Sequence, residues 1–272
     1  MAHVGTAHVL ADHQNVRYQI ATLLKKSIKR TIVLLGFLAV WELAPRLGLA
    51  SPVFLPPLSE VVVAWWHMAL SGELATHITA SLGRSFTGYA LAILYAIPLG
   101  LAIGWYKGLS EIVNPLLEIL RNTAALALLP VFILLLGIGE SSKIAVVIFA
   151  CSWPILLNTI SGVQNVDPLL IKSAQSLCLS PAQLFRKVML PASLPSIFVG
   201  ARLAGASSIL VLVAAEMIGA KAGLGYLIIY SQYNFVVPKM YAGIITISII
   251  GLMLNQTLLQ FEKIFTGWKP VH

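Results

Sequence analysis

A few charged and amide side chains interrupt otherwise apolar stretches, and they are the residues of this chain best suited to chemistry. Arg121 and Asn122 lie in one such stretch, and Arg202 and Glu216 lie in another. An arginine guanidinium is a planar fork of donors that matches the oxygens of sulfonate, carboxylate or nitrate. Charges inside apolar spans are costly and often mark a functional site. The candidates for lining a membrane pathway are therefore Arg121, Asn122, Arg202 and Glu216, with Arg121 and Asn122 suited to an anion; the stretch of Arg202 and Glu216 could instead form the contact with a second copy.

Each of these charges also has a structural alternative. Glu118 lies three residues before Arg121, so the two side chains can pair on one face of a helix. Glu216 can pair with Lys221 or Lys239 instead of facing a pathway.

Three other charges have simple structural expectations. Glu42 and Arg46 are four residues apart, which predicts an ion pair near the end of the first apolar stretch. Arg84 stands at the start of the second stretch, where its long side chain is expected to reach toward the membrane surface.

The chain lacks the common signatures of an enzyme. It contains no GxxxxGK[ST] phosphate loop, no HExxH and no GxSxG. Its two cysteines, Cys151 and Cys178, are too few for a four-ligand metal site. An intramembrane enzyme would need catalytic groups at one depth, and the candidates are scattered. An ion-coupled transporter acting alone would predict inverted repeats, and none is evident. We expect no catalytic residue, cofactor or metal in this chain.

Composition points to a membrane protein. Of the 272 residues, 58% are apolar and only 10% are charged, whereas a soluble domain usually carries about 25% charged residues. The net charge is +8, but no run of five basic residues occurs. The basic cluster of Lys25, Lys26, Lys29 and Arg30 directly precedes an apolar stretch, which is typical of a membrane flank. We therefore expect lipid as the main partner of the surface, and no nucleic acid.

The apolar stretches predict an all-α, polytopic fold with about six transmembrane helices. A span needs about 20 apolar residues, and the candidates are about 31–49, 84–106, 113–137, 142–163, 191–219 and 241–262. The fifth stretch is rich in small residues and is expected to be central. Gly100 and Gly104 form a GxxxG helix-contact motif. Trp65 and Trp66 lie in a short apolar segment that predicts an interfacial helix.

Charge distribution predicts the orientation and the organisation of the chain. With both termini in the cytoplasm, eleven Lys and Arg residues lie inside and four outside. Residues 1–76 hold one span and residues 77–265 hold five, which is the one domain boundary that we draw.

The loop of about residues 164–190 is long for a helical membrane protein. Leu170, Ala174, Leu177 and Leu184 lie near one helix face, and Ser180 precedes a proline in a typical helix start. We expect two short cytoplasmic helices that present apolar side chains, either to lipid or to a partner.

This loop resembles the EAA loop of ATP-binding-cassette importer permeases. The family pattern is Glu-Ala-Ala, three residues, Gly, nine residues, an aliphatic residue, any residue and Leu-Pro. Here Lys172-Ser173-Ala174 takes the first three places, Cys178 the glycine place, and Val188 and Leu190-Pro191 the end. The segments that resemble the taurine, aliphatic sulfonate and nitrate branch are Arg121-Asn122, 126–130, 137–144, Ala215-Glu216 and 223–226. The likeness covers about residues 35–265.

The resemblance implies the type I importer permease fold and a set of partners. A second permease copy, two ATP-binding subunits and an extracytoplasmic solute-binding protein would surround the chain in a bacterial inner membrane, with ATP and Mg in the ATP-binding subunits. The implied solute is a small anion, first an aliphatic sulfonate or taurine; nitrate, bicarbonate or a thiamine precursor are alternatives. The implied contacts with the ATP-binding subunit are Lys172, Ser173, Ala174, Leu177, Cys178, Leu179, Ser180 and Phe185.

Two positions of the loop depart from the family pattern. Lys172 replaces the glutamate and Cys178 replaces the glycine. A glycine would permit positive φ, which cysteine does not adopt easily. We therefore expect the loop to turn differently, or to meet an equally unusual partner.

Overall fold

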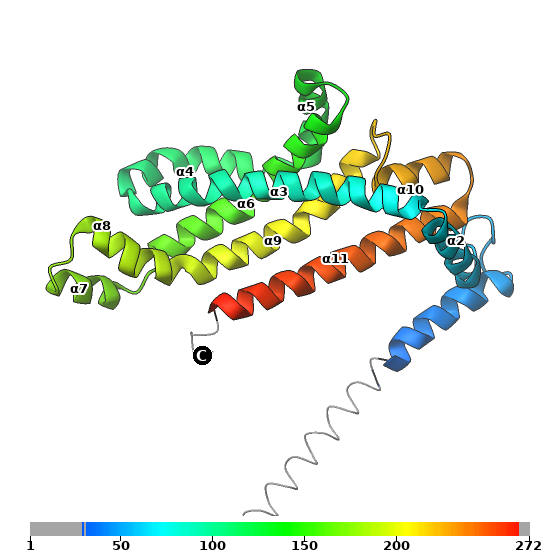
Figure 1. Ribbon diagram of the computed structural model, residues 1–272, viewed down its shortest axis with the longest axis horizontal. Helices are drawn as coiled ribbons and strands as arrows, with labels where there is room; N and C mark the ends of the chain where they lie inside the picture. The colour runs from blue at the N-terminus through cyan, green and yellow to red at the C-terminus, as the bar shows by residue number, and fades with distance from the viewer. Residues whose placement is uncertain (1–28, 30, 267–272) are drawn as a thin grey trace, which may run out of the picture. The chain divides into compact units, whose positions relative to one another are not determined.

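The computed structural model describes residue 29 and residues 31–266, and the part that it describes is helical and contains no strand (Figure 1). The chain divides into two compact units, Met1–Val63 and Ala64–His272, which are described separately.

In the first unit, residues 31–46 form a helix that coincides with the first predicted span. The predicted pair between Arg46 and Glu42 is confirmed, with 2.6 Å between the nearest nitrogen and oxygen atoms. Ser59 donates to Glu42 from both its backbone nitrogen (2.9 Å) and its hydroxyl (3.0 Å). The Trp41 indole donates to the Pro56 carbonyl oxygen at 3.2 Å. The segment after the helix is thus held by polar contacts. The helix that follows, α2 (Leu58–Leu70), begins in this unit.

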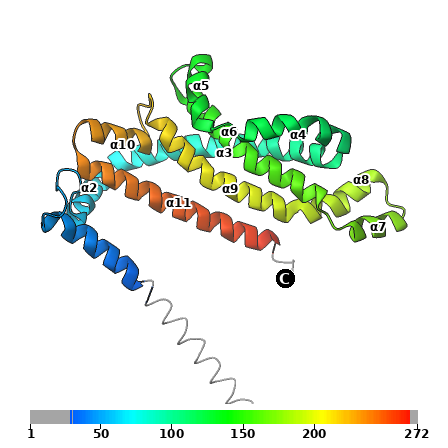
Figure 2. The same ribbon diagram turned by 180° about the vertical axis from the view of Figure 1, so that it is seen from behind.

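The second unit contains the long helices. Its elements are α3 (Glu73–Trp105), α4 (Lys107–Arg121), η1 (Ala125–Leu128), α5 (Leu129–Leu136), α6 (Glu140–Gln164), α7 (Pro168–Ser176), α8 (Pro181–Leu184), η2 (Phe185–Met189), α9 (Leu190–Glu216), α10 (Leu224–Tyr233) and α11 (Val237–Thr266). Four helical runs are long and apolar enough to cross a membrane: α3, α6, α9 with the short elements before it, and α11. They lie side by side (Figure 2). Four of the predicted spans are therefore present, although α3 begins eleven residues earlier than expected.

The third predicted span is wrong as a single helix. It is divided into α4 and the η1–α5 segment, which meet at an angle of 85°. The break has a local cause. The Asn122 amide donates to the Glu118 carbonyl oxygen at 2.7 Å, and the Thr123 backbone nitrogen donates to the Leu120 carbonyl oxygen, so the carbonyls at the end of α4 are satisfied without a further turn. Pro130 then stands in the first turn of α5, where proline is well tolerated.

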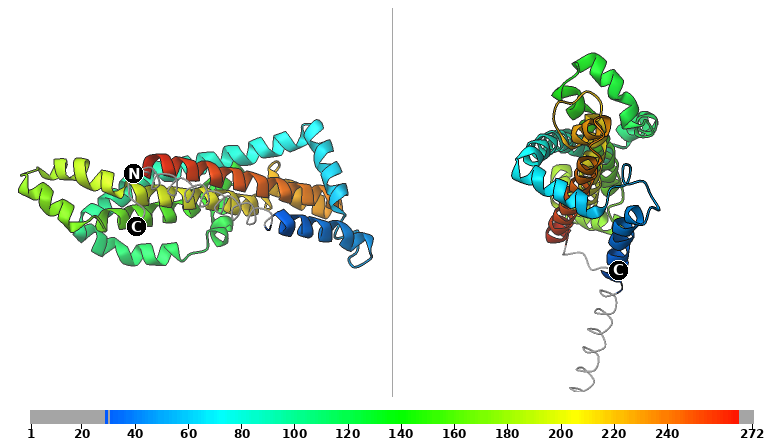
Figure 3. Two further views of the ribbon diagram at one scale, coloured as in Figure 1. Left: turned by 90° about the horizontal axis from the view of Figure 1, so that it is seen from below. Right: turned by 90° about the vertical axis from the view of Figure 1, so that its right-hand side faces the viewer.

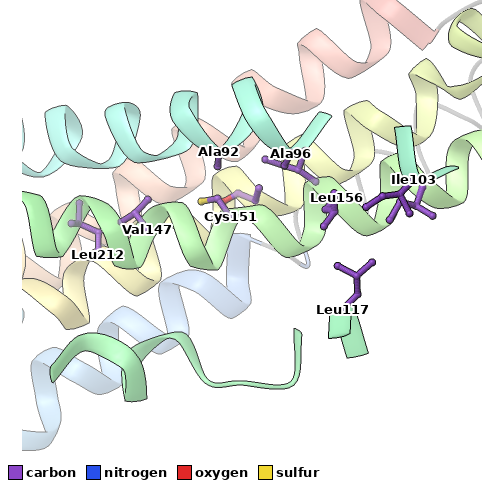
Figure 4. Packing of buried hydrophobic residues seen from close by; sticks show 11 residues of the cluster. Ala92, Ala96, Ile103, Leu117, Val147, Cys151, Leu156 and Leu212 are labelled. Atoms are coloured by element: carbon purple, nitrogen blue, oxygen red, sulfur yellow. The ribbon is translucent and has the colours of Figure 1, made fainter. Parts of the chain in front are cut away.

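The core of this unit depends on close approach between α3 and α6. Small residues recur at every fourth position of α3 and face α6; they are Gly88, Ala92, Ala96, Gly100 and Gly104. A Cβ atom at Gly100 would overlap the Thr159 side chain, and one at Gly104 would overlap Val163. Figure 4 shows Ala92 and Ala96 beside Cys151 of α6. The helix-contact role predicted for Gly100 and Gly104 is confirmed.

Helix α9 is central, as its small residues predict. It packs against α3, α6, α10 and α11. A Cβ at Gly200 would meet the Pro154 carbonyl oxygen of α6, and one at Gly205 would meet Leu258 of α11. Ala204 is fully buried between them. Glycine and alanine let the backbones on both sides of α9 approach closely.

Candidate functional site

The loop between α6 and α9 lies at one end of the helical unit, opposite α10 (Figure 1 and Figure 3). Helix α7 begins at Asp167, whose carboxylate accepts from the Leu169 backbone nitrogen at 2.8 Å. Helix α8 begins with a capping box: the Ser180 hydroxyl accepts from the Gln183 backbone nitrogen, and the Gln183 side chain accepts from the Ser180 backbone nitrogen. Pro181 follows in the first turn. The two predicted helices are confirmed, and local capping explains where each begins.

The turn between the two helices has a Schellman geometry with Cys178 at its left-handed position. Cys178 has φ +55°. Its backbone nitrogen donates to the Gln175 carbonyl oxygen, and that of Leu179 donates to the Ala174 carbonyl oxygen. Of the two expectations for Cys178, a different turn of the loop is therefore wrong, and an equally unusual partner stays a prediction. The backbone adopts the conformation that glycine favours, and it bears the steric cost of a Cβ atom there.

The loop has one side on the bundle and one side free. Ala174 is buried, and Phe185 packs edge to face on Trp105 of α3, with ring centroids 5.2 Å apart. Leu177 is 76% exposed, and Leu170 is 48% exposed. The predicted contact residues at the surface are Lys172, Ser173, Leu177, Cys178 and Ser180, with Leu179 half-buried. The loop is thus held on the bundle by Ile171 and Phe185, and its tip is open to a partner.

The other end of the unit contains a buried cluster of charges. Arg84 of α3 is 6% exposed and Glu216, the last residue of α9, is fully buried. Arg84 Nη1 lies 2.6 Å from Glu216 Oε1 and 2.7 Å from the Ala222 carbonyl oxygen. Its other nitrogens bind Glu140, at the start of α6, with Nη2 2.7 Å from Oε1. One guanidinium therefore joins α3, α6 and α9.

Neutral groups complete the environment of Glu216. Its carboxylate accepts from the Ser81 hydroxyl at 2.8 Å and from the Gly225 backbone nitrogen at 3.0 Å. Positions 223 and 225 have no room for a side chain, because a Cβ at either would overlap atoms of Glu216. Lys143, 2% exposed, donates to the carbonyl oxygens of Gly139 (3.0 Å) and Gly219 (3.3 Å). A buried charge is tolerated only when it is paired and hydrogen-bonded, and the Glu216 carboxylate is both.

Two of the sequence expectations for these charges are wrong. Arg84 does not reach for the surface, because α3 begins at Glu73 and therefore carries Arg84 three turns into the helix. Glu216 pairs with neither Lys221 nor Lys239, because Arg84 occupies its carboxylate. Lys239 binds Glu73 instead, at 2.7 Å.

The four pathway candidates do not gather at one place. Glu216 belongs to the buried cluster. Arg202 pairs with Glu262 of α11 at 2.8 Å and lines a largely apolar pocket of about 360 Å³ between α3, α9 and α11. Arg121 and Asn122 are exposed where α4 ends, and in the described residues Arg121 forms no ion pair with Glu118.

No group of three or more metal-ligating side chains that could hold an ion is found in residues 29 and 31–266.

Comparison with known proteins identifies the family. Residues 96–263 match the binding-protein-dependent transport system inner membrane component. The chain belongs to this family. It is thus an importer permease, an integral protein of the inner membrane.

Named relatives agree with that assignment. A probable ABC transporter permease of Brucella abortus (strain 2308) is 36% identical over 229 residues, which are 84% of this chain and 90% of that protein. The taurine transport system permease of Escherichia coli (strain K12) is 35% identical over 236 residues, 85% and 86% of the two chains. A solved structure titled as inward-facing conformations of the MetNI methionine ABC transporter covers 71% of this permease and 96% of its own chain, with a TM-score of 0.62 and 18% identity. That likeness shows the fold.

Sequence reasoning missed most of the buried cluster of this permease. Ser81, Glu140 and Lys143 were not recognised as partners of a site, and Glu262 was not recognised as the partner of Arg202. The pair of Arg84 and Glu216 could have been suspected from the sequence. Arg84 starts one apolar stretch and Glu216 lies in another, and a buried charge requires an opposite charge.

Proposed function

We propose that this permease forms the translocation pathway of an ATP-driven importer for a small organic anion, with taurine and other aliphatic sulfonates as the first candidates. Two copies would form the pathway, each bound to one ATP-binding subunit. A solute-binding protein would deliver the anion on the opposite side of the membrane. The observation that carries the proposal is the α7–α8 loop, which combines a rigid anchor with an exposed tip.

The geometry of the loop suits the transmission of force. Ile171 and Phe185 pack in an apolar cluster with Leu101 and Trp105 of α3 and Val163 of α6, while Leu177 and Ser180 are exposed at the tip of the loop. Movement of a bound partner would therefore be passed to the spans as rigid-body motion. The ATP-binding subunit is the partner that we propose, with contacts on the exposed residues of the loop.

We propose the orientation that places this loop in the cytoplasm, because most Lys and Arg residues outside the spans then lie inside. Both chain termini would be cytoplasmic as well, and the buried charge cluster of Arg84 and Glu216 would lie near the outer surface.

For the solute, the favoured contact residues are Arg121 and Asn122. They lie at the break between α4 and α5, and transporters often build solute sites from discontinuous helices. The guanidinium suits a sulfonate group. Arg202 and Glu216 are weaker candidates because their charges already have partners. The similarity to a taurine permease supports the choice of anion.

The docking proposal can be tested with the natural cysteines. Cys178 is exposed and Cys151 is buried, so a thiol-reactive photo-crosslinker should label the loop tip without any engineered site. In membranes that contain the ATP-binding subunit, we expect a crosslinked permease–ATPase product. The matched control Cys178→Ser should give none. Labelling of Cys178 without any crosslink to the ATP-binding subunit would contradict the docking proposal.

The transport proposal requires the complete assembly in vesicles. With the ATP-binding subunit and the binding protein present, we expect ATP-dependent uptake of taurine, and no uptake when the ATP-binding subunit is omitted. Arg121→Ala should lower the uptake rate about tenfold or more, while Glu118→Gln, one turn away and also exposed, should leave it unchanged. Full uptake by the permease alone would overturn the proposal. Equal rates in Arg121→Ala and wild type would remove Arg121 from the pathway.

A further inference from the structure

An open pocket of about 530 Å³ separates the last turns of α3 from the start of α8. Its lining residues are Pro98, Leu101, Ala102, Trp105, Tyr106, Pro181, Ala182 and Phe185. Except for the Tyr106 hydroxyl and the Trp105 indole nitrogen, these side chains are hydrocarbon. On the loop side, the lining residue Phe185 is the first residue of η2, a wide helical turn. Turns of this kind often occur at functional sites. The pocket therefore favours an elongated apolar group that enters from its open side.

Three cations lie next in the chain to residues that line this apolar pocket. Lys107 directly follows the lining residue Tyr106, and Arg186 and Lys187 directly follow the lining residue Phe185. All three are exposed, and in the described part of the chain none of them forms an ion pair. The acidic residue nearest to Lys107 along α4 is Glu111, one helical turn away. A group that carries both hydrocarbon and negative charge would satisfy the pocket and the three cations together.

The position of the pocket along α3 matches a membrane surface. Arg84 and Trp105 are 21 residues apart on α3, about 31 Å along a helix, which is the thickness of the hydrocarbon core of a bilayer. The proposed orientation places the Arg84 cluster near the outer boundary, so Trp105 and Tyr106 would lie near the inner one, where aromatic residues typically meet lipid headgroups.

We propose that this pocket binds an anionic phospholipid of the membrane. An acyl chain lies against Trp105 and Phe185, and the phosphate and anionic headgroup bind Lys107, Arg186 and Lys187. Because Phe185 and Pro181 belong to the α7–α8 loop, the lipid joins that loop to α3. The inference goes beyond the proposed function. It uses the proposed orientation only to say which leaflet supplies the lipid, and it does not depend on the identity of the solute or on the ATP-binding subunit.

The binding can be measured with the full-length permease in lipid vesicles. Brominated phospholipids quench tryptophan fluorescence on contact, and the difference between wild type and Trp105→Phe isolates the signal of Trp105. We expect brominated phosphatidylglycerol to quench that signal at a several-fold lower mole fraction than brominated phosphatidylcholine. Each cation changed to glutamine, at 107, 186 or 187, should reduce the preference about fivefold or less. Lys263→Gln, an exposed cation at the end of α11, is the matched control and should keep the preference.

A second variant tests the apolar half of the site. Ala102→Phe fills the pocket without changing any charge, and it should abolish quenching at Trp105 by both lipids. Equal quenching of Trp105 by the two lipids would overturn the proposal. So would loss of the quenching when the ATP-binding subunit is added, because the pocket would then be covered by that subunit. Quenching that keeps its preference in the assembled complex would support the lipid.

Discussion

The two ends of the helical unit are built on opposite principles. At the Arg84 end, the Arg84 guanidinium and the Glu216 carboxylate are buried, Ser81 and Gly225 donate hydrogen bonds to Glu216, and the exposed Glu140 also binds Arg84. At the loop end, Cys178 has a left-handed backbone, and leucine side chains are exposed. The first end connects three helices through polar contacts that tolerate little displacement. The loop end leaves leucine side chains exposed to a partner and keeps Cys178 in a strained backbone conformation. Under the proposed function, movement applied at the loop end would pivot the spans about the Arg84 end.

The largest effect should come from breaking the buried pair. Glu216→Gln removes the charge that balances Arg84, and loss of one partner of a buried ion pair costs about 3–5 kcal/mol. We expect a marked fall in the unfolding midpoint of the detergent-solubilised permease. Glu118→Gln, an exposed carboxylate on α4, should change stability by no more than about 0.5 kcal/mol. If Glu216→Gln unfolds at the same midpoint as wild type, the cluster is not what holds this end together.

A smaller loss should follow from crowding the same end. Gly225→Ala places a Cβ against the Val213 carbonyl oxygen and Glu216, and overpacking typically costs about 1–3 kcal/mol. Gly83→Ala is the matched control: Gly83 is a helical glycine of α3, next to Arg84 in the chain, and it has open space around it. The control should be neutral or should stabilise the helix by up to about 1 kcal/mol. The unfolding midpoint should therefore fall in Gly225→Ala and stay the same or rise in Gly83→Ala, and equal shifts would refute the packing argument.

These two ends also show what could be predicted from the sequence. Apolar length predicts α6, α9 and α11 well, because a span is a property of consecutive residues. The partner of Glu216 could not be predicted, since Arg84 is 132 residues away in the chain and only the packing of α3 on α9 brings them together. The break after Arg121 was missed because the chain is apolar on both sides of the short polar segment 121–123, whereas the amide of Asn122 ends the helix there.

In the loop, too, the features that depend on neighbouring residues could be predicted from the sequence, and those that depend on tertiary packing could not. Ser180 and Pro181 predict the start of α8 correctly, because a capping box depends only on neighbouring residues. The conformation of Cys178 could not be predicted from its residue type, because cysteine rarely adopts positive φ. It is imposed by the two helices that the turn must join.

Relief of that strain gives the third prediction. Cys178→Gly should stabilise the loop by about 1 kcal/mol, because glycine adopts φ near +55° without the steric cost of a Cβ atom. Leu177→Gly, one residue earlier with φ −83°, should instead destabilise it, since there glycine only adds freedom to the unfolded chain. Amide hydrogen exchange of residues 174–179 should slow in the first variant and accelerate in the second. Faster exchange in Cys178→Gly would show that the turn is not strained.

The smallest effect tests whether the loop is a defined structure before any partner binds. Ser180→Ala removes the hydroxyl that accepts from the Gln183 backbone nitrogen, and loss of such a cap costs about 1 kcal/mol. Ser180→Asp keeps an acceptor at the same position and should retain most of the stability. Because α8 is only one turn long, exchange of the Gln183 and Leu184 amides should rise severalfold in the alanine variant, while the unfolding midpoint of the whole permease stays almost unchanged. A fall in the global midpoint would mean that the loop is part of the same cooperative unit as the buried charges, and the contrast between the two ends would then be lost.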